Sequence, residues 1–191
     1  MKFRDLKAEE IEVRIQSTKD NGLVLLLYMD SRACMNILDE TVGAENWQRE
    51  HYECKGNLYC RVGIKCREAD IDVRANTKEI LRDEWVWKSD CGAESNTEAQ
   101  KGEASDSFKR ACFNWGVGRE LYTSPFIWVG ADKCDIKDSG KKANNGKPIF
   151  VCYDNFTVKK IIIENKQIIA LAIWNENKKC WAFVWQKEAK K

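Results

Sequence analysis

Hydrophobic residues recur at two different spacings along the 191-residue chain, and the spacing changes near Trp47. Behind Ser31, a residue type that often caps helices, apolar side chains return every three or four positions until Gly43, a typical stop. From Trp47 onward apolar and polar residues alternate, which is typical of strands. We therefore predict a helix and then a two-stranded hairpin, over about 31–42, 47–54 and 58–67.

The second strand of this hairpin sorts its side chains by face. One face carries Cys60, Val62, Ile64 and Cys66, and the other carries Arg61, Gly63, Lys65 and Arg67. A third strand is predicted over 84–92, and a second helix opens at Thr97. Small and apolar residues form one stripe on that helix, namely Ala104, Phe108, Ala111, Cys112 and Trp115. Residues 1–118 thus predict a helix, three strands and a helix.

The two ends of the chain have patterns of their own. Residues 6–15 carry a short helical pattern, a turn follows at 19–22, and 23–28 form an apolar run. Turn residues fill 131–148 and predict a flexible loop. Beyond it the alternation returns in three runs that predict a meander, over 156–164, 167–174 and 180–185.

These elements predict an α+β protein. We expect a helix, a three-stranded antiparallel sheet and a long helix (a β-β-β-α core), with a C-terminal strand-rich meander. The expected domain organisation is a core over 1–130, the loop over 131–148 and an extension over 149–191 packed on the same domain.

Composition narrows the class of protein. Hydrophobic residues make up 43%, charged residues 32%, and the mean hydropathy is −0.56, values that favour a globular protein of the cytoplasm. The longest apolar run, 23–28, is too short to span a membrane, and we expect no membrane partner. Nine cysteines without a C-x-x-C pair and a single histidine, His51, predict reduced thiols and no metal site.

Charge is distributed unevenly. The net charge is +2 overall, whereas residues 131–191 contain 13 Lys and Arg against 7 Asp and Glu, a net charge of +6. Residues 1–130 are therefore net acidic, by −4. An anion site in this first part needs individually placed basic residues instead of a general positive field.

Three features of the sequence that could indicate an enzyme have simpler explanations. The segment 140–147 departs from a phosphate loop in its glycine spacing. Gly116-x-Gly118 follows a predicted helix, whereas the glycine motif of dinucleotide-binding proteins follows a strand. His51 lies in a predicted strand, where a histidine usually acts as a cross-strand polar residue. Five acidic residues leave a metal-dependent nuclease open as an alternative: Asp70, Asp72, Asp83, Glu84 and Asp90.

The densest signal is the run from Lys101 to Arg119. On a helix Lys101 and Lys109 share one stripe, and Arg110 follows Asp106 by one turn. The run is compatible with a solvated helix face, and equally with a helix that offers Lys109 and Arg110 to phosphates.

The predicted strand 85–92 is followed by the motif Lys-x-Glu-Ala-Ser-Asp-x-x-Lys-Arg-Ala and an aromatic-Gly ending. This combination resembles the Rad-fifty-two type single-strand annealing protein family, especially its phage and prophage branch. The segment 28–47, with its helix and Gly-x-x-x-Trp ending, is similar too, and the resemblance covers roughly residues 23–130. It implies a homo-oligomeric ring that binds single-stranded DNA and anneals complementary strands without ATP or a cofactor. A bacterial host cell, a phage exonuclease and a single-strand binding protein are the implied setting and partners.

The resemblance also implies DNA-binding residues, and none of them is catalytic. Lys109 and Arg110 match the family's Lys-Arg pair at the inner DNA site. Phe113 stands where the eukaryotic form has a further basic residue, so we expect basic residues of the hairpin to substitute. The remaining candidates are Arg61, Lys65 and Arg67 of the hairpin, Lys101 for an outer site, Arg32 and Arg119. Arg32 lies one position before Ala33, which is the position that matches the family's basic residue on the first long helix. A structural oligomeric module that binds protein through the meander remains a second alternative.

Overall fold

A computed structural model describes the backbone of residues 1–71, 79–93 and 99–188 and the side chains of 1–66, 83–93 and 100–188. The chain divides into two compact units. The first unit is Met1–Arg4 with Ser31–Val117, and the second unit is Asp5–Asp30 with Gly118–Lys191. The second unit therefore combines both ends of the chain, whereas the sequence placed residues 1–130 in one core.

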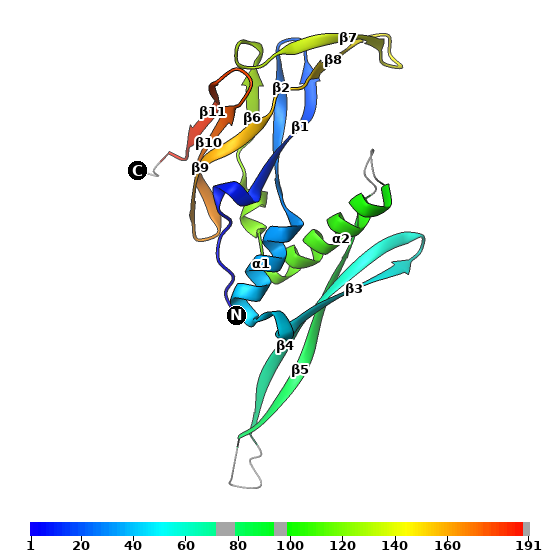
Figure 1. Ribbon diagram of the computed structural model, residues 1–191, viewed down its shortest axis with the longest axis vertical. Helices are drawn as coiled ribbons and strands as arrows, with labels where there is room; N and C mark the ends of the chain where they lie inside the picture. The colour runs from blue at the N-terminus through cyan, green and yellow to red at the C-terminus, as the bar shows by residue number, and fades with distance from the viewer. Residues whose placement is uncertain (72–78, 94–98, 189–191) are drawn as a thin grey trace. The chain divides into compact units, whose positions relative to one another are not determined.

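The first unit contains the elements that the sequence predicted for it (Figure 1). They are α1 (Ser31–Val42), the short 3-10 helix η2 (Ala44–Asn46), β3 (Trp47–Cys54), β4 (Asn57–Ile71), β5 (Glu79–Cys91) and α2 (Ala99–Trp115). The strands form an antiparallel sheet in the order β3-β4-β5, and α2 packs on β4 and β5. Thr97, the predicted start of the second helix, lies outside the described residues. Neither α-helix of the described part is long and apolar enough to cross a membrane.

One buried layer joins α2 to the sheet. Val62 and Ile64 of β4 and Phe108 of α2 are completely buried, as the predicted faces require. Trp47 of β3 stacks on Phe108 with 6.1 Å between ring centroids. Burying each such large side chain contributes about 1.5–3 kcal/mol, so this layer fixes the helix on the sheet. Burial raises the pKa of the Cys60 thiol to about 11, and the protonated thiol packs in this core as a small apolar group.

The second unit is built almost entirely from strands. Its elements are η1 (Ala8–Glu10), β1 (Ile11–Lys19), β2 (Gly22–Met29), η3 (Arg119–Thr123), β6 (Ile127–Gly130), η4 (Ala131–Lys133), β7 (Ile136–Lys142), β8 (Pro148–Cys152), β9 (Phe156–Glu164), β10 (Gln167–Asn175) and β11 (Cys180–Gln186). Six strands form a curved antiparallel sheet in the order β11-β10-β9-β1-β2-β6, and β7 and β8 form a separate two-stranded sheet (Figure 1).

The core of the second unit draws on both ends of the chain. Leu23 and Leu25 of β2, Val129 of β6, and Leu171 and Ile173 of β10 are all at most 1% exposed. The cross-strand pairs Leu23↔Val129 and Leu25↔Ile127 place the β2 and β6 side chains on the same face. The predicted meander is present as β9-β10-β11, and its buried side chains belong to the same unit.

Two expectations were wrong for the second unit. Residues 6–15, predicted as a helix, form η1 and most of β1, because Ile11, Val13 and Ile15 alternate and pair with β2. The helix-forming residues Ala8, Glu9 and Glu10 make only a single 3-10 turn. Residues 131–148, predicted as a loop, contain η4, all of β7 and the start of β8. There the backbone hydrogen bonds of a hairpin outweigh the turn-rich composition.

Candidate nucleic-acid interface

Three side chains of α2, spaced four residues apart, tie the helix to β5 and its end. Asp106 accepts a hydrogen bond from the Ala93 N–H at 3.1 Å, and Asn114 donates to the Ser89 carbonyl at 3.0 Å. Between them, Nε of Arg110 lies 3.3 Å from Oδ1 of Asp90. The Arg110 side chain remains 43% exposed, so the ion pair with Asp90 restrains a guanidinium that solvent still reaches.

The other edge of α2 is held by β3 and β4. A ring nitrogen of His51 lies 3.1 Å from the Ala104 carbonyl oxygen, and Oε1 of Glu103 accepts a hydrogen bond from the Leu58 N–H at 3.0 Å. His51 therefore contacts the helix backbone, in agreement with a polar structural role. Because both edges of α2 are anchored, the half-buried Lys109 and Arg110 sit on a rigidly placed helix.

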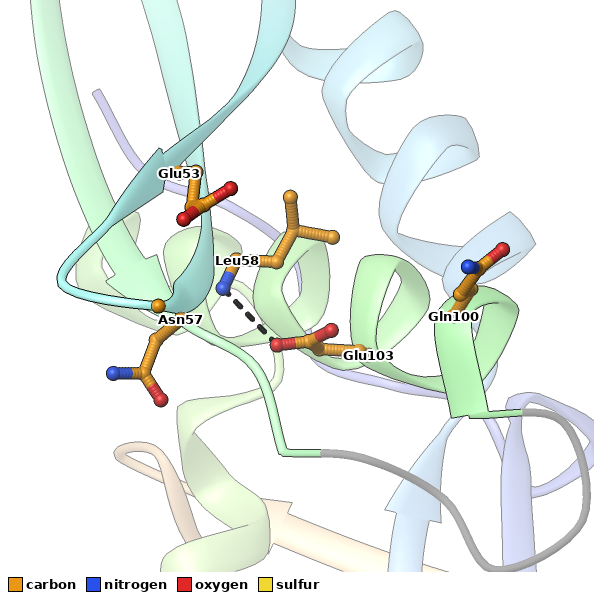
Figure 2. Close-up of a pocket in the computed structure, with 6 residues that line it drawn as sticks. Glu53, Asn57, Leu58, Gln100 and Glu103 are labelled. Carbon is orange, nitrogen blue, oxygen red and sulfur yellow. Dashed lines mark hydrogen bonds between the residues drawn. The ribbon is translucent and has the colours of Figure 1, made fainter.

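A hollow of about 340 Å³ lies between the β3-β4 turn and the start of α2. Figure 2 shows Glu53 and Glu103 at its wall, with Gln100 on the helix beyond them. Glu103 points to β4, where its carboxylate meets the Leu58 N–H. Two carboxylates repel phosphate, so this hollow does not suit a DNA backbone.

The basic face predicted for β4 exists and points away from α2, but its charges are paired. Arg61 lies 2.6 Å from Glu50 and covers the Trp87 ring at 4.5 Å, and Lys65 lies 2.8 Å from Asp83. Gly63 leaves room for the Trp87 ring, because a Cβ would lie 2.9 Å from it and the ring would have to shift. The face is therefore a mixture of ion pairs and aromatic rings.

The structure brings together some of the predicted DNA-binding residues and separates others. Lys101, Lys109 and Arg110 lie on α2, and the alternation along β4 puts Arg61 and Lys65 on the face of the sheet that α2 does not cover. The remaining candidates are an exposed Arg32 on α1, an exposed Arg119 that belongs to the second unit, and Arg67, whose side chain lies outside the described residues.

The acidic residues proposed for a nuclease do not converge in the described part of the chain. Asp83 and Asp90 point to opposite faces of β5, and each pairs with a basic residue. Asp72 and the side chain of Asp70 lie outside the described residues. Among the described residues, no three His, Cys, Asp or Glu side chains are grouped to hold a metal ion.

Sequence reasoning missed the acidic partners of the basic candidates. Glu50 could have been found only with a two-residue turn at 55–56, which places it opposite Arg61, whereas the three-residue turn between the predicted strands would place it opposite Val62. Asp90 could not, because its pairing with Arg110 depends on how α2 docks on β5. These partners reduce the net positive charge of the candidate interface.

The part of the sequence that forms α1, the β3-β4-β5 sheet and α2 lies within the match to a known family. A model of the Rad52/22 family of double-strand break repair proteins matches residues 3–137. The chain belongs to this family. Rad52/22 membership assigns it to DNA binding in double-strand break repair, among annealing proteins that are not enzymes.

The Rad52/22 match covers the first unit except for its first two residues and ends within β7, so β8 to β11 lie beyond it. Searches of curated proteins and of solved structures gave no match.

Proposed function

We propose that this Rad52/22 protein binds single-stranded DNA through Lys109 and Arg110 and anneals complementary strands without ATP. The observation that carries the proposal is the position of these two residues on a helix anchored at both edges to the β3-β4-β5 sheet. Family membership supports DNA as the ligand. The phage-type setting rests on the resemblance of the helix motif alone.

Contacts to phosphate suit annealing because they leave the bases available for pairing. Lys109 supplies a point charge, and the planar guanidinium of Arg110 can form parallel hydrogen bonds to a phosphate. Asp90 holds the guanidinium in place, which reduces the side-chain entropy lost on binding. Backbone contacts of this kind bind DNA without sequence preference, as an annealing protein requires.

Two features support an oligomer: the low net charge of one chain, and the position of basic candidates on both faces of the β3-β4-β5 sheet. With a net charge of +2, each chain can neutralise only a few phosphates, so tight binding requires several copies on one strand. Arg61 and Lys65 point away from α2. A DNA strand that contacts them together with Lys109 would therefore be shared between neighbouring subunits, and a closed ring is the arrangement we propose.

The test is the annealing of two complementary labelled oligonucleotides in EDTA, without nucleotide, at low and moderate salt. The wild type is expected to accelerate annealing, and K109Q/R110Q to lose the acceleration while its mass in solution is unchanged. Two lost phosphate contacts should lower the salt slope of single-strand binding by about 1.4. K2Q/K55Q is the matched control, because it removes two exposed charges of the first unit that lie outside α2 and are not among the predicted DNA-binding residues.

Full annealing by K109Q/R110Q would contradict the proposed site. A wild type that leaves the strands intact, unbound and unannealed would contradict the function and favour the protein-binding module. Cleavage that appears only with a divalent metal would favour the nuclease.

A further inference from the structure

The tip of the β7-β8 hairpin carries a concentrated positive charge beyond the Rad52/22 match. Residues 139–148 read Ser-Gly-Lys-Lys-Ala-Asn-Asn-Gly-Lys-Pro and include Lys141, Lys142 and Lys147 with no acidic residue. The family match ends at residue 137, so this tip is an addition to the matched region. All three lysine side chains are exposed.

The backbone of the tip is well defined without help from its lysine side chains. Gly146 N–H donates to the Ala143 carbonyl at 2.8 Å, and Ala143 N–H donates to the Lys147 carbonyl at 2.9 Å. The Asn145 side chain accepts from the Lys147 N–H at 3.2 Å. These bonds place Lys142 and Lys147 on either side of one tight turn.

Neutralising partners are missing at this tip. Within the described part of the chain, no carboxylate lies in ion-pair range of Lys141, Lys142 or Lys147. Other lysines of the second unit do have such partners: Lys137 lies 2.9 Å from Asp135 and Lys159 lies 2.6 Å from Glu176. Like charges on one turn repel each other, and a bound polyanion would relieve that repulsion.

We propose that Lys141, Lys142 and Lys147 form a second nucleic-acid contact, which binds the phosphate backbone independently of α2. The inference rests on the proposed function, because it takes DNA as the ligand. The tip contains no aromatic or large aliphatic residue, so it has no anchor of the kind that protein interfaces use, and no platform for base stacking. Lysines act as point charges on phosphates, and the contact is therefore independent of sequence.

The test measures binding of a labelled single-stranded oligonucleotide by fluorescence anisotropy between 50 and 200 mM salt. K141Q/K142Q/K147Q should lower the slope of log affinity against log salt by about 2, since each single-strand contact contributes about 0.7. K141R/K142R/K147R should keep the wild-type slope. The control K19Q/K160Q/K178Q removes three exposed lysines elsewhere in the second unit and should change the slope less than the hairpin variant.

Each outcome separates this inference from the proposed function. An unchanged salt slope in the hairpin variant, or an equal fall of the slope in the control, would overturn the inference. The proposed function would stand in that case, provided that the wild type binds the oligonucleotide. A wild type that binds no DNA at all would contradict both. A slope that falls in the hairpin variant and falls again when K109Q/R110Q is added would support two separate contacts.

Discussion

At the scale of single residues, three of the basic candidates are each paired with one carboxylate. Arg61 with Glu50, Lys65 with Asp83 and Arg110 with Asp90 are all partly exposed. Ion pairs of this kind contribute only about 0–1 kcal/mol, because water screens them. A phosphate can therefore replace the carboxylate at little cost, and the pairs keep the cations positioned until it does.

The same kind of pairing predicts a measurable pKa in the second unit. Glu176 accepts a hydrogen bond from Lys159 at 2.6 Å and from the Thr157 hydroxyl at 2.8 Å, and these bonds lower its pKa from 4.5 to about 2. Because the folded-state pKa is depressed, the stabilisation is present above pH 4.5 and is lost as the pH falls through about 2. NMR titration of the Glu176 carboxyl carbon should give a midpoint near 2.

Lys159 is the largest cause of that shift, so K159Q should move the Glu176 midpoint upward toward 4.5. K160Q, on the neighbouring residue, is the matched control. A wild-type midpoint at the ordinary value would show that the hydrogen bond from Lys159 does not form in solution.

At the scale of elements, the placement of α2 depends on a close approach at the end of β5. A Cβ on Gly92 would lie 2.2 Å from the Glu103 carbonyl oxygen and 3.0 Å from the Ser107 nitrogen. Both are backbone atoms, so G92A must push α2 away from the strand. We expect a loss of about 1–3 kcal/mol in the free energy of unfolding, measured with denaturant.

The neighbouring A93S is the control, because Ala93 is exposed, and it should leave the free energy of unfolding nearly unchanged. G92A should also weaken DNA binding, since the same helix carries Lys109 and Arg110. Wild-type stability in G92A would mean that α2 does not approach β5 so closely.

The sequence predicted the type of an element correctly where one face of the segment is buried and the other is exposed. The alternation in β4 predicted correctly that Val62 and Ile64 face α2 while Arg61 points away. The prediction failed for residues 6–15, where helix-forming residues precede a strand whose partner, β2, is found only in the folded sheet. A helix carrying Lys109 and Arg110 was predictable, whereas the pairing of Arg110 with Asp90 depends on tertiary docking and could not be read from spacing.

At the scale of the whole molecule, the family match and the folded units have different boundaries. The match over 3–137 includes β1, β2 and β6 but none of β9, β10 or β11, although all six belong to one sheet. Leu23 and Val129 of the matched part are completely buried, and the unit that buries them also contains Leu171 and Ile173 of the meander. We therefore expect the second unit to need the C-terminal strands for its fold.

A chain ending at residue 137 should consequently lose the second unit and keep the first. Removing β8 to β11 takes away Val158, Ile168, Leu171 and Ile173, each of which contributes about 1.5–3 kcal/mol of burial, and the total rivals the whole stability of a typical domain. Hydrogen exchange should show that β1 and β2 lose protection while β4 and α2 retain it, because the core of Val62, Ile64 and Phe108 lies entirely within the first unit. A chain ending at Gln186, which keeps all of β11, should match the full chain in both units. Slow exchange of β2 in the chain ending at 137 would instead show that the matched region folds without the meander, and that β9 to β11 are available for another role.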